Sequence, residues 1–434
     1  MRASSMFVVG IVVISSMLSC SKSSDNEEIS VGNRKLPPVA APSFGENDWP
    51  WWRGPHRDGR AIGESYPTEW SDTKNVIWKA VIPGRGHSSP TVVGDQIFVA
   101  TAEKKRRVQT VICFDRNDGS VRWRKDVHQG PLGSMGHRDS SYASATPACD
   151  GERIFAVFRH DGQVYVTALS TEGEQLWQKK VGSHDSQWGY APSPVIHKEL
   201  VIVAADSDKQ GFIAALHRKT GEIWWRKHRP KADAYSSPIV AHVAGKDQLF
   251  IPGGKKVVSY DPMTGEENWS VDGCAEVTCG TMVWNDDTVF ASGGYNGSET
   301  LAIRADGSGK VVWRTSKYDF YVPSMLLHEG HIYSVDGGVA YCVDASTGDV
   351  VKKLRLGGNY YASPILAGGY LYFTSRGGKV TIVNPDPKSF QKVTTNQLGE
   401  QAEATPVACG GRLYFRVART EGGFRKEYLY CIGE

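Results

Sequence analysis

Residues 213–225 read IAALHRKTGEIWW, which gives an apolar strand, a polar turn containing glycine, and a second strand that carries tryptophan. Gly221 supplies the positive φ that a tight hairpin turn requires, and the polar residues before it favour the turn. The same order recurs in segments 111–123, 166–177, 257–269, 301–313 and, with lysine in place of tryptophan, 340–352. Each segment is therefore predicted to form the second half of a repeated unit.

A first hairpin precedes each of these segments. It opens with small residues and often proline, and continues as two short apolar strands around a polar or glycine turn, as in SSPTVVGDQIFVA from Ser88. Eight such openings occur, at Ser88, Ser144, Ala191, Ser236, Cys279, Pro323, Ser363 and Ala404. Four-stranded units repeated at this period cannot bury both faces alone, and they stack as the blades of a propeller.

The ring is predicted to close with a strand from the N-terminal side. The eighth unit ends as EYLYCIG, a third strand, so it lacks a fourth strand of its own. Segment 75–84, NVIWKAVIPG, resembles an outer strand, with Trp78 in the place of the repeated tryptophan. We therefore expect an all-β, monomeric protein: an eight-bladed β-propeller of four-stranded antiparallel blades over residues 75–434, closed by this N-terminal strand.

The repeated tryptophans are predicted to be structural. A tryptophan that recurs on the outer strand most simply packs one sheet against the next, and stacking on a cofactor is the less favoured alternative. The predicted blade-docking residues are Trp78, Trp123, Trp177, Trp225, Trp269 and Trp313.

Residues 1–20 are predicted to be a lipoprotein signal peptide. Arg2 precedes an apolar stretch, MFVVGIVVI, that is too short to span a bilayer, and Cys20 lies where a bacterial lipoprotein carries its lipid. Ordinary cleavage near the same place is the alternative. Residues 21–48 are polar and are expected to form a tether. The mature chain would then be exported to the cell envelope and held at a membrane by acyl chains, more readily the outer membrane than the inner.

Charge and cysteine content restrict the function classes. A net charge of +3 over 434 residues gives no global electrostatic footprint for nucleic acid. Equivalent positions on different blades are too far apart to bridge, so most cysteines are expected to be small buried side chains. Cys274 and Cys279 flank one inter-blade loop, and a disulfide between them stays open as an alternative. Residue spacing suggests neither a metal site nor a haem attachment site.

Strand directions place the candidate functional residues on one face of the propeller. The loops that lead into the first strands and the hairpins between second and third strands share this face, which surrounds the central channel. We call it the lead-in face, and the opposite face, with the glycine turns, the turn face. The candidate ligand-binding residues are His87, His137, Asp139, Tyr142, Trp188, Tyr190, Tyr235, Glu276, Tyr321, Tyr360 and Glu403. Such a set suits a polar planar or sugar-like ligand, although tyrosines that merely fill the channel mouth would give the same pattern.

The turn sequence DxxTG followed by tryptophan resembles the docking repeat of the pyrroloquinoline quinone (PQQ) type β-propeller family, which includes quinoprotein dehydrogenases and BamB-like outer-membrane assembly lipoproteins. Segment 49–59, WPWWRGPHRDG, with YPTEW ending at Trp70, is similar to the lead-in of PQQ-binding-like lipoproteins of Planctomycetes-type bacteria. Residues 49–74 are therefore expected to form a tryptophan-rich clasp across a face or rim.

The resemblance implies three readings of function. We favour a non-enzymatic binding or scaffold protein that binds a protein or extended peptide on its propeller face, without a cofactor; barrel-protein assembly is one instance. The alternative is a PQQ- and Ca2+-dependent oxidoreductase of alcohols or sugars, but the candidate carboxylates Glu276, Glu403 and Asp139 lie on different loops, and the adjacent cysteine pair of many alcohol-oxidising members is missing. A carbohydrate-binding propeller is the third reading. No catalytic residue is assigned.

Overall fold

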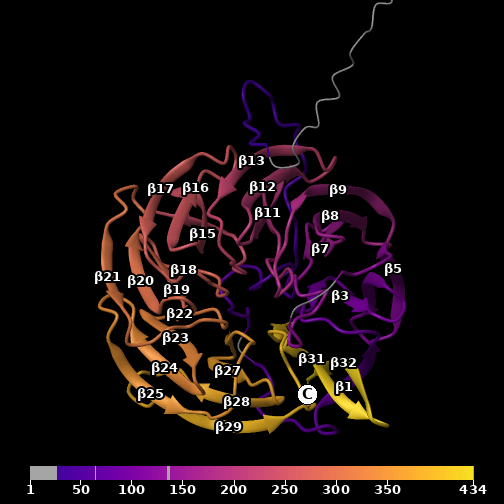
Figure 1. Cartoon of the computed structure of the whole chain (residues 1–434). Helices are drawn as coiled ribbons and strands as arrows, with labels where there is room; N and C mark the ends of the chain where they lie inside the picture. Colours follow the sequence, from indigo (N-terminus) through magenta and orange to yellow (C-terminus); the bar gives the residue numbers. More distant parts are fainter. Residues whose placement is uncertain (1–26, 64, 134–136, 434) are drawn as a thin grey trace, which may run out of the picture.

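Eight four-stranded antiparallel sheets form a closed ring around one axis (Figure 1). The computed structural model describes residues 27–63, 65–133 and 137–433. Cys20 and the predicted signal peptide lie outside these residues. The expected all-β, eight-bladed propeller is confirmed.

The first four blades follow one another along the chain. Blade 1 consists of β2 (Thr91–Val93), β3 (Gln96–Glu103), β4 (Val108–Asp115) and β5 (Val121–Gln129). Blade 2 consists of β6 (Ala148–Cys149), β7 (Arg153–His160), β8 (Gln163–Ser170) and β9 (Gln175–Ser183). Blade 3 consists of β10 (Val195–His197), β11 (Leu200–Asp206), β12 (Gly211–His217) and β13 (Ile223–Arg229). Blade 4 consists of β14 (Ile239–Val243), β15 (Lys246–Gly253), β16 (Lys256–Tyr260) and β17 (Glu267–Asp272).

The second half of the ring repeats this order. Blade 5 consists of β18 (Val283–Trp284), β19 (Thr288–Gly293), β20 (Glu299–Arg304) and β21 (Val311–Thr315). Blade 6 consists of β22 (Leu326–His328), β23 (His331–Asp336), β24 (Val339–Asp344) and β25 (Val350–Arg355). Blade 7 consists of β26 (Ile365–Ala367), β27 (Tyr370–Thr374), β28 (Lys379–Asn384) and β29 (Gln391–Gln397). Blade 8 consists of β30 (Val407–Cys409), β31 (Arg412–Glu421), β32 (Phe424–Ile432) and β1 (Val76–Ile82).

The closing strand is the one expected from the sequence. β1 pairs antiparallel with β32, with Trp78 opposite Cys431 and Ile82 opposite Glu427. It thereby supplies the fourth strand that the C-terminal unit lacks. The outer edge of β32 is paired with β1 from Glu427 to Ile432, so most of that edge is closed to association with another chain.

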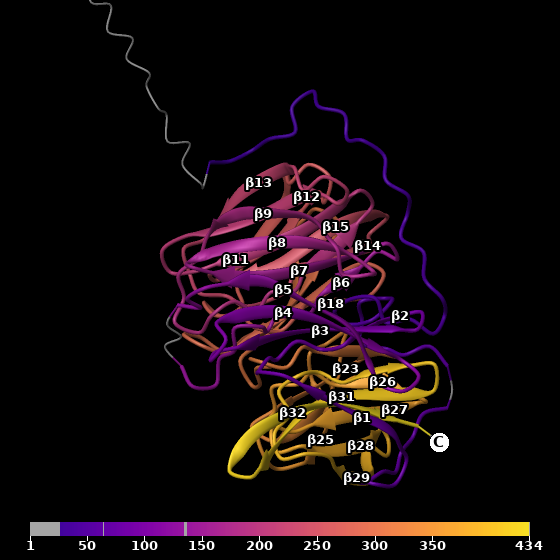
Figure 2. The same cartoon turned by 90° about the vertical axis from the view of Figure 1, so that its right-hand side faces the viewer.

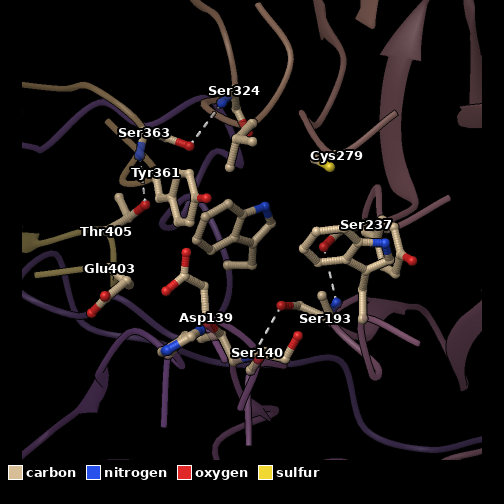
Figure 3. Close-up of a pocket in the computed structure, with 18 of the residues that line it drawn as sticks. Asp139, Ser140, Ser193, Ser237, Cys279, Ser324, Tyr361, Ser363, Glu403 and Thr405 are labelled. Carbon is tan, nitrogen blue, oxygen red and sulfur yellow. Dashed lines mark hydrogen bonds between the residues drawn. The ribbon is translucent and has the colours of Figure 1, made fainter. Parts of the chain in front are cut away.

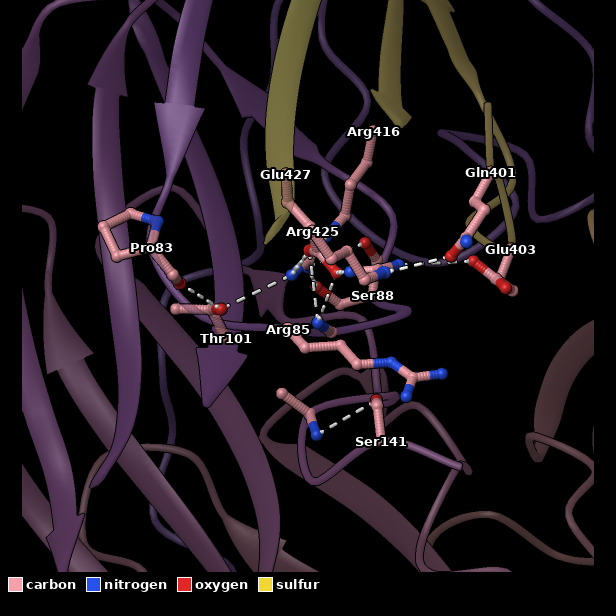
Figure 4. A network of polar contacts seen from close by, with 12 residues as sticks. Pro83, Arg85, Ser88, Thr101, Ser141, Gln401, Glu403, Arg416, Arg425 and Glu427 are labelled. Carbon is pink, nitrogen blue, oxygen red and sulfur yellow. Dashed lines mark hydrogen bonds and ion pairs between the residues drawn. The ribbon is translucent and has the colours of Figure 1, made fainter. Parts of the chain in front are cut away.

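A buried ion pair connects blade 8 to blade 1 (Figure 4). Arg416 donates to Glu427 Oε2 from Nε at 2.8 Å and from Nη2 at 2.6 Å, and both side chains are almost completely buried. The same guanidinium donates from Nη1 to the Ala100 carbonyl at 2.7 Å and to Ser88 Oγ at 3.0 Å. The C-terminal blade is thus joined to the first blade by charge-assisted hydrogen bonds, in addition to the pairing of β1 with β32 inside blade 8.

Five of the repeated tryptophans contact the glycine turn of the following blade. A Cβ on Gly119, Gly173, Gly221, Gly265 or Gly348 would lie 2.5–2.7 Å from the ring of Trp78, Trp123, Trp177, Trp225 or Trp313, respectively. Each of these five indole N–H groups donates to a backbone carbonyl of that turn at 2.8–3.1 Å. The glycine therefore has two roles: it adopts the positive φ of the turn, and its lack of a side chain lets the indole ring pack directly on the turn.

Trp269 makes a different contact. Its indole N–H donates to Gln248 Oε1 in its own blade at 3.2 Å, and the next turn places Gly309 against Val271. Blade 5 has the turn ADGSGK, which runs differently from the DxxTG turns. Trp269 is nevertheless buried in the core between blades 4 and 5.

The chain before β1 lies along the turn face (Figure 2). Ile29 pairs with Arg226 on the outer strand β13, and the Arg34 guanidinium lies 4.5 Å from the Trp224 ring centroid. Further along, Trp49 pairs with Val92 of β2. The described part of segment 21–48, from residue 27, thus follows the propeller surface.

The tryptophan-rich segment 49–74 is packed into the propeller. Buried Arg53 donates to the Pro364 carbonyl at 2.9 Å and to the Met325 carbonyl at 2.7 Å, which ties blades 7 and 6 together. Trp70 is buried and its ring centroid lies 6.3 Å from that of Tyr372. Cys274 and Cys279 are free thiols, so the structure does not form the disulfide left open above. Within the described ranges no helix is long and apolar enough to cross a membrane.

Buried histidines make the fold sensitive to acid. Burial, with a smaller effect of Arg159, lowers the pKa of His184 from 6.5 to about 4. Between these values the unfolded chain binds more protons than the folded one, so stability falls as pH falls through this window. We expect urea unfolding to show a loss of about 1–2 kcal/mol from His184 between pH 7 and pH 5.

The variant His184→Gln should reduce this dependence on pH. His242→Gln is the matched control, because the His242 side chain is 69% exposed. An unchanged pH dependence in His184→Gln would contradict the assignment.

Candidate functional site

An axial pocket of about 280 Å³ opens on the lead-in face where the blades converge (Figure 3). Most of its lining comes from the segments that lead into the innermost strands. Its hydroxyl-bearing walls are formed by Ser140, Ser144, Thr146, Ser193, Ser237, Ser324, Ser363 and Thr405. Its aromatic walls are formed by Trp52, Trp188, Tyr235, Tyr321 and Tyr361. His87, Asp139, Cys279 and Glu403 also line it.

A series of hydroxyl groups links successive blades around the pocket. In six blades, the residue two positions before the innermost strand donates its backbone N–H to the equivalent hydroxyl of the next blade at 2.9–3.0 Å. These bonds are Ser89 to Thr146, Thr146 to Ser193, Ser193 to Ser237, Thr281 to Ser324, Ser324 to Ser363 and Ser363 to Thr405. Because these oxygens act as acceptors, their O–H protons stay available for other partners.

The floor of the pocket comes from the tryptophan-rich segment. Trp52 enters from the turn face and donates its indole N–H to Thr281 Oγ1 at 2.7 Å. This bond lies at the junction of blades 4 and 5, where the hydroxyl of Thr281 accepts from Trp52. The N-terminal segment therefore does more than clasp the rim, because it supplies an aromatic surface at the base of the pocket.

One wall of the pocket holds paired charges. Arg376 lies 3.1 Å from Asp139 and 3.5 Å from Glu403, and its guanidinium carbon lies 4.2 Å from the Tyr361 ring centroid. Arg425 lies 3.7 Å from the second oxygen of Glu403. Burial alone would raise the pKa of Asp139, but the contact with Arg376 outweighs it and lowers that pKa. Asp139 is therefore held ionised, and both carboxylates are paired with arginine.

His87 adds an unpartnered polar group. Its Nε2 atom is buried without a hydrogen-bond partner. Burial, followed by the positive charges of Arg85, Arg416, Arg425 and Arg376, lowers the pKa of His87 well below its ordinary value. The imidazole is neutral at pH 7 and faces the pocket as one donor and one acceptor.

The structure brings together about half of the candidate residues and separates the others. Those that line the axial pocket are His87, Asp139, Trp188, Tyr235, Tyr321 and Glu403. His137 lies at its rim, with its ring centroid 4.1 Å from that of Trp188. The remaining four lie elsewhere. Tyr142 bonds to the Gly133 carbonyl, Tyr190 and Tyr360 are buried in the core, and Glu276 faces Lys255 at 3.4 Å.

Residue patterns did not predict Arg376, Trp52 or the hydroxyl series as parts of the site. The hydroxyl series could have been predicted from the Ser-Pro or Thr-Pro pairs that open several units, such as Ser193 before Pro194 and Thr405 before Pro406. Arg376 lies in a hairpin between second and third strands, and its approach to Asp139 depends on the path of a long loop.

The donor set does not fit a calcium-assisted quinone centre. Such a centre needs a cation held by clustered carboxylate and amide oxygens and a carboxylate free to act as a base. Asp139 and Glu403 are the acidic groups of the pocket, and both are paired with arginine. Across residues 27–63, 65–133 and 137–433, no group of three or more His, Cys, Asp or Glu side chains is arranged to hold a metal ion.

Comparisons with known proteins agree with the repeat architecture. The family model described as "Outer membrane protein assembly factor BamB" matches residues 68–187 and 107–354, which together span more than half of the chain. The BamB protein of Burkholderia pseudomallei (strain K96243) is 26% identical over 386 residues, covering 75% of this chain and 92% of that protein.

Two solved structures share the fold. BamB from Moraxella catarrhalis has a TM-score of 0.61 at 15% identity, over 82% of this chain and 99% of that one. A europium-containing methanol dehydrogenase has a TM-score of 0.69 at 11% identity, over 90% and 98% of the two chains. At these identities the likeness concerns the propeller alone. On the family match, the chain belongs to the BamB-type family of PQQ-like β-propellers.

Proposed function

We propose that this chain is an exported, lipid-anchored binding or scaffold protein of the cell envelope that takes part in outer-membrane protein assembly. Its family membership supports the class of function, and the predicted signal and Cys20 support the location. The proposal requires no cofactor and no catalytic residue. It places a protein or peptide partner on the lead-in face.

The observation that carries the proposal is the exposure of large aromatic side chains on that face. Tyr295, in the hairpin of blade 5, is 57% exposed, and Phe424, at the tip of the long hairpin of blade 8, is 71% exposed. Trp188 is 43% exposed on the loop that leads into blade 3. Exposed aromatic groups beside arginine are typical of protein interaction surfaces, where a few of them account for most of the affinity.

The double variant Tyr295→Ala/Phe424→Ala should weaken the partner interaction by about 2–4 kcal/mol, because two aromatic contacts are removed. In a strain that lacks the chain, the wild-type protein should restore the amount of folded barrel protein in the outer membrane, and the double variant should restore much less.

Val121→Ala is the matched control. Val121 is an exposed apolar residue, but it lies on the outer strand β5, away from the lead-in face. Full restoration by the double variant, or no effect of deleting the chain on barrel proteins, would contradict the proposed function. Folding of each variant is checked by its thermal unfolding midpoint.

A further inference from the structure

The axial pocket has a chemistry of its own, and of the three exposed aromatic side chains of the lead-in face only Trp188 also lines it. We propose that it binds one pyranose ring of a neutral sugar. The pocket combines three features that a sugar uses together: an array of hydroxyl donors, a charge-balanced wall with fixed acceptors, and aromatic surfaces.

The hydroxyl series supplies donors around the axis. Thr146, Ser193, Ser237, Ser324, Ser363 and Thr405 each accept a backbone N–H and line the cavity. A hydroxyl has one proton, and these bonds leave it available for donation. A pyranose carries hydroxyl oxygens at successive positions around its ring, so it can accept from several of these groups at once.

The charged wall favours a neutral ligand over an anion or a cation. Two carboxylates, Asp139 and Glu403, face two guanidinium groups, Arg376 and Arg425, at 3.1–3.7 Å. These four charges offset one another, so this group of side chains by itself gives neither an anion nor a cation a net electrostatic advantage. The carboxylate oxygens can still accept ligand O–H groups, and arginine fixes their positions.

His87 extends this set of polar groups. Its buried Nε2 has no partner in the protein, and a buried polar atom without a partner costs free energy until a ligand or water supplies one. A neutral imidazole can pair with a sugar hydroxyl in either direction, as donor or as acceptor.

Aromatic rings supply the apolar surfaces. Trp52 forms the floor, Trp188 stands at the rim, and Tyr361 is held on the side wall beneath Arg376. The C–H faces of a pyranose are apolar, so they pack on such rings while the hydroxyl groups point to the polar wall. A volume of about 280 Å³ lies near the lower end of the roughly 300–1,000 Å³ usual for small-ligand pockets, which suits a single ring or a chain end.

The test is titration of the purified mature chain with neutral hexoses, N-acetylhexosamines and their disaccharides, followed by calorimetry and tryptophan fluorescence. We expect saturable binding of at least one neutral sugar. Trp188→Ala and Asp139→Asn should each weaken it by tenfold or more, since they remove an exposed stacking surface and a fixed acceptor. Asp118→Asn is the matched control, because Asp118 is exposed in a glycine turn on the turn face.

Three results would overturn the assignment: no saturable binding of any sugar in the panel, binding that Trp188→Ala and Asp139→Asn leave unchanged, or tighter binding of an anionic sugar acid than of its neutral parent. The single variant Phe424→Ala, which removes the exposed ring at the tip of the blade 8 hairpin, should bind the sugar as the wild type does. Loss of the proposed partner interaction can therefore be told apart from loss of the pocket ligand.

Discussion

Trp225→Ala is expected to lower the free energy of unfolding by about 3–5 kcal/mol, because a fully buried indole is removed from the interface between blades 3 and 4. The side chain is 0% exposed, and its ring covers Gly265 of the next blade. Its N–H group also donates to the Pro262 carbonyl at 3.1 Å, and that buried acceptor would lose its partner. Chemical denaturation followed by circular dichroism measures the change.

Leu176→Ala is the control for this experiment. Leu176 is on the outer strand β9, directly before a docking tryptophan, but it is 47% exposed. Its replacement should change stability by about 0.5 kcal/mol or less. If Trp225→Ala changes stability as little as Leu176→Ala, the packing of Trp225 on the Gly265 turn does not stabilise the interface between blades 3 and 4.

Asp206→Asn is expected to cost about 3–5 kcal/mol, because it leaves the Arg229 guanidinium buried without a compensating charge. Arg229 Nε lies 3.0 Å from both carboxylate oxygens of Asp206, and Nη2 lies 2.8 Å from Oδ2. The Asp206 side chain is 4% exposed and the Arg229 side chain is 0% exposed. The remaining contact of Arg229 Nη2, with the Pro252 carbonyl at 3.3 Å, does not replace a charge.

The double variant Asp206→Leu/Arg229→Met separates the two possible causes of this loss. Apolar residues of similar volume should restore most of the stability, because the buried charge is then absent from both sides. Asp272→Asn, in the exposed pair of Asp272 with Lys256, should have an effect below about 1 kcal/mol. If the double variant is as unstable as Asp206→Asn, the loss comes from packing and not from the charge.

Local patterns sufficed to predict the propeller. The glycine turn followed by tryptophan marks the third and fourth strands of a unit, and the missing last strand together with segment 75–84 predicts the closure. Both signals can be recognised in short stretches of sequence. Because the units must close into a ring, these patterns are compatible with only one arrangement of the strands. The blades of the structure follow the predicted units, including blade 7, which lacks both the glycine turn and the tryptophan.

The site was predicted less completely, because loop side chains follow no period. Tyr360 and Tyr361 are neighbours, yet the first is buried in the core and the second lines the pocket. Tyr190 turns inward and donates to the Ala204 carbonyl of its own blade at 3.0 Å. Strand direction assigns a loop to a face, but the path of the loop backbone decides which of its side chains reach the axis. Trp52 reaches the axis from the turn face. It belongs to the N-terminal segment outside the repeated units, so the directions of the blade strands could not predict its position.

The pairing of β1 with β32 also orders the events of folding. The strand that completes the last blade is synthesised before every other blade, and its partner is the final strand of the chain. During synthesis, β1 has no strand to pair with until more than three hundred further residues have followed it. Contacts so remote in sequence form late and slowly. The ring is therefore completed only after all the other blades have been synthesised, and a chain interrupted before β32 leaves β1 without its partner.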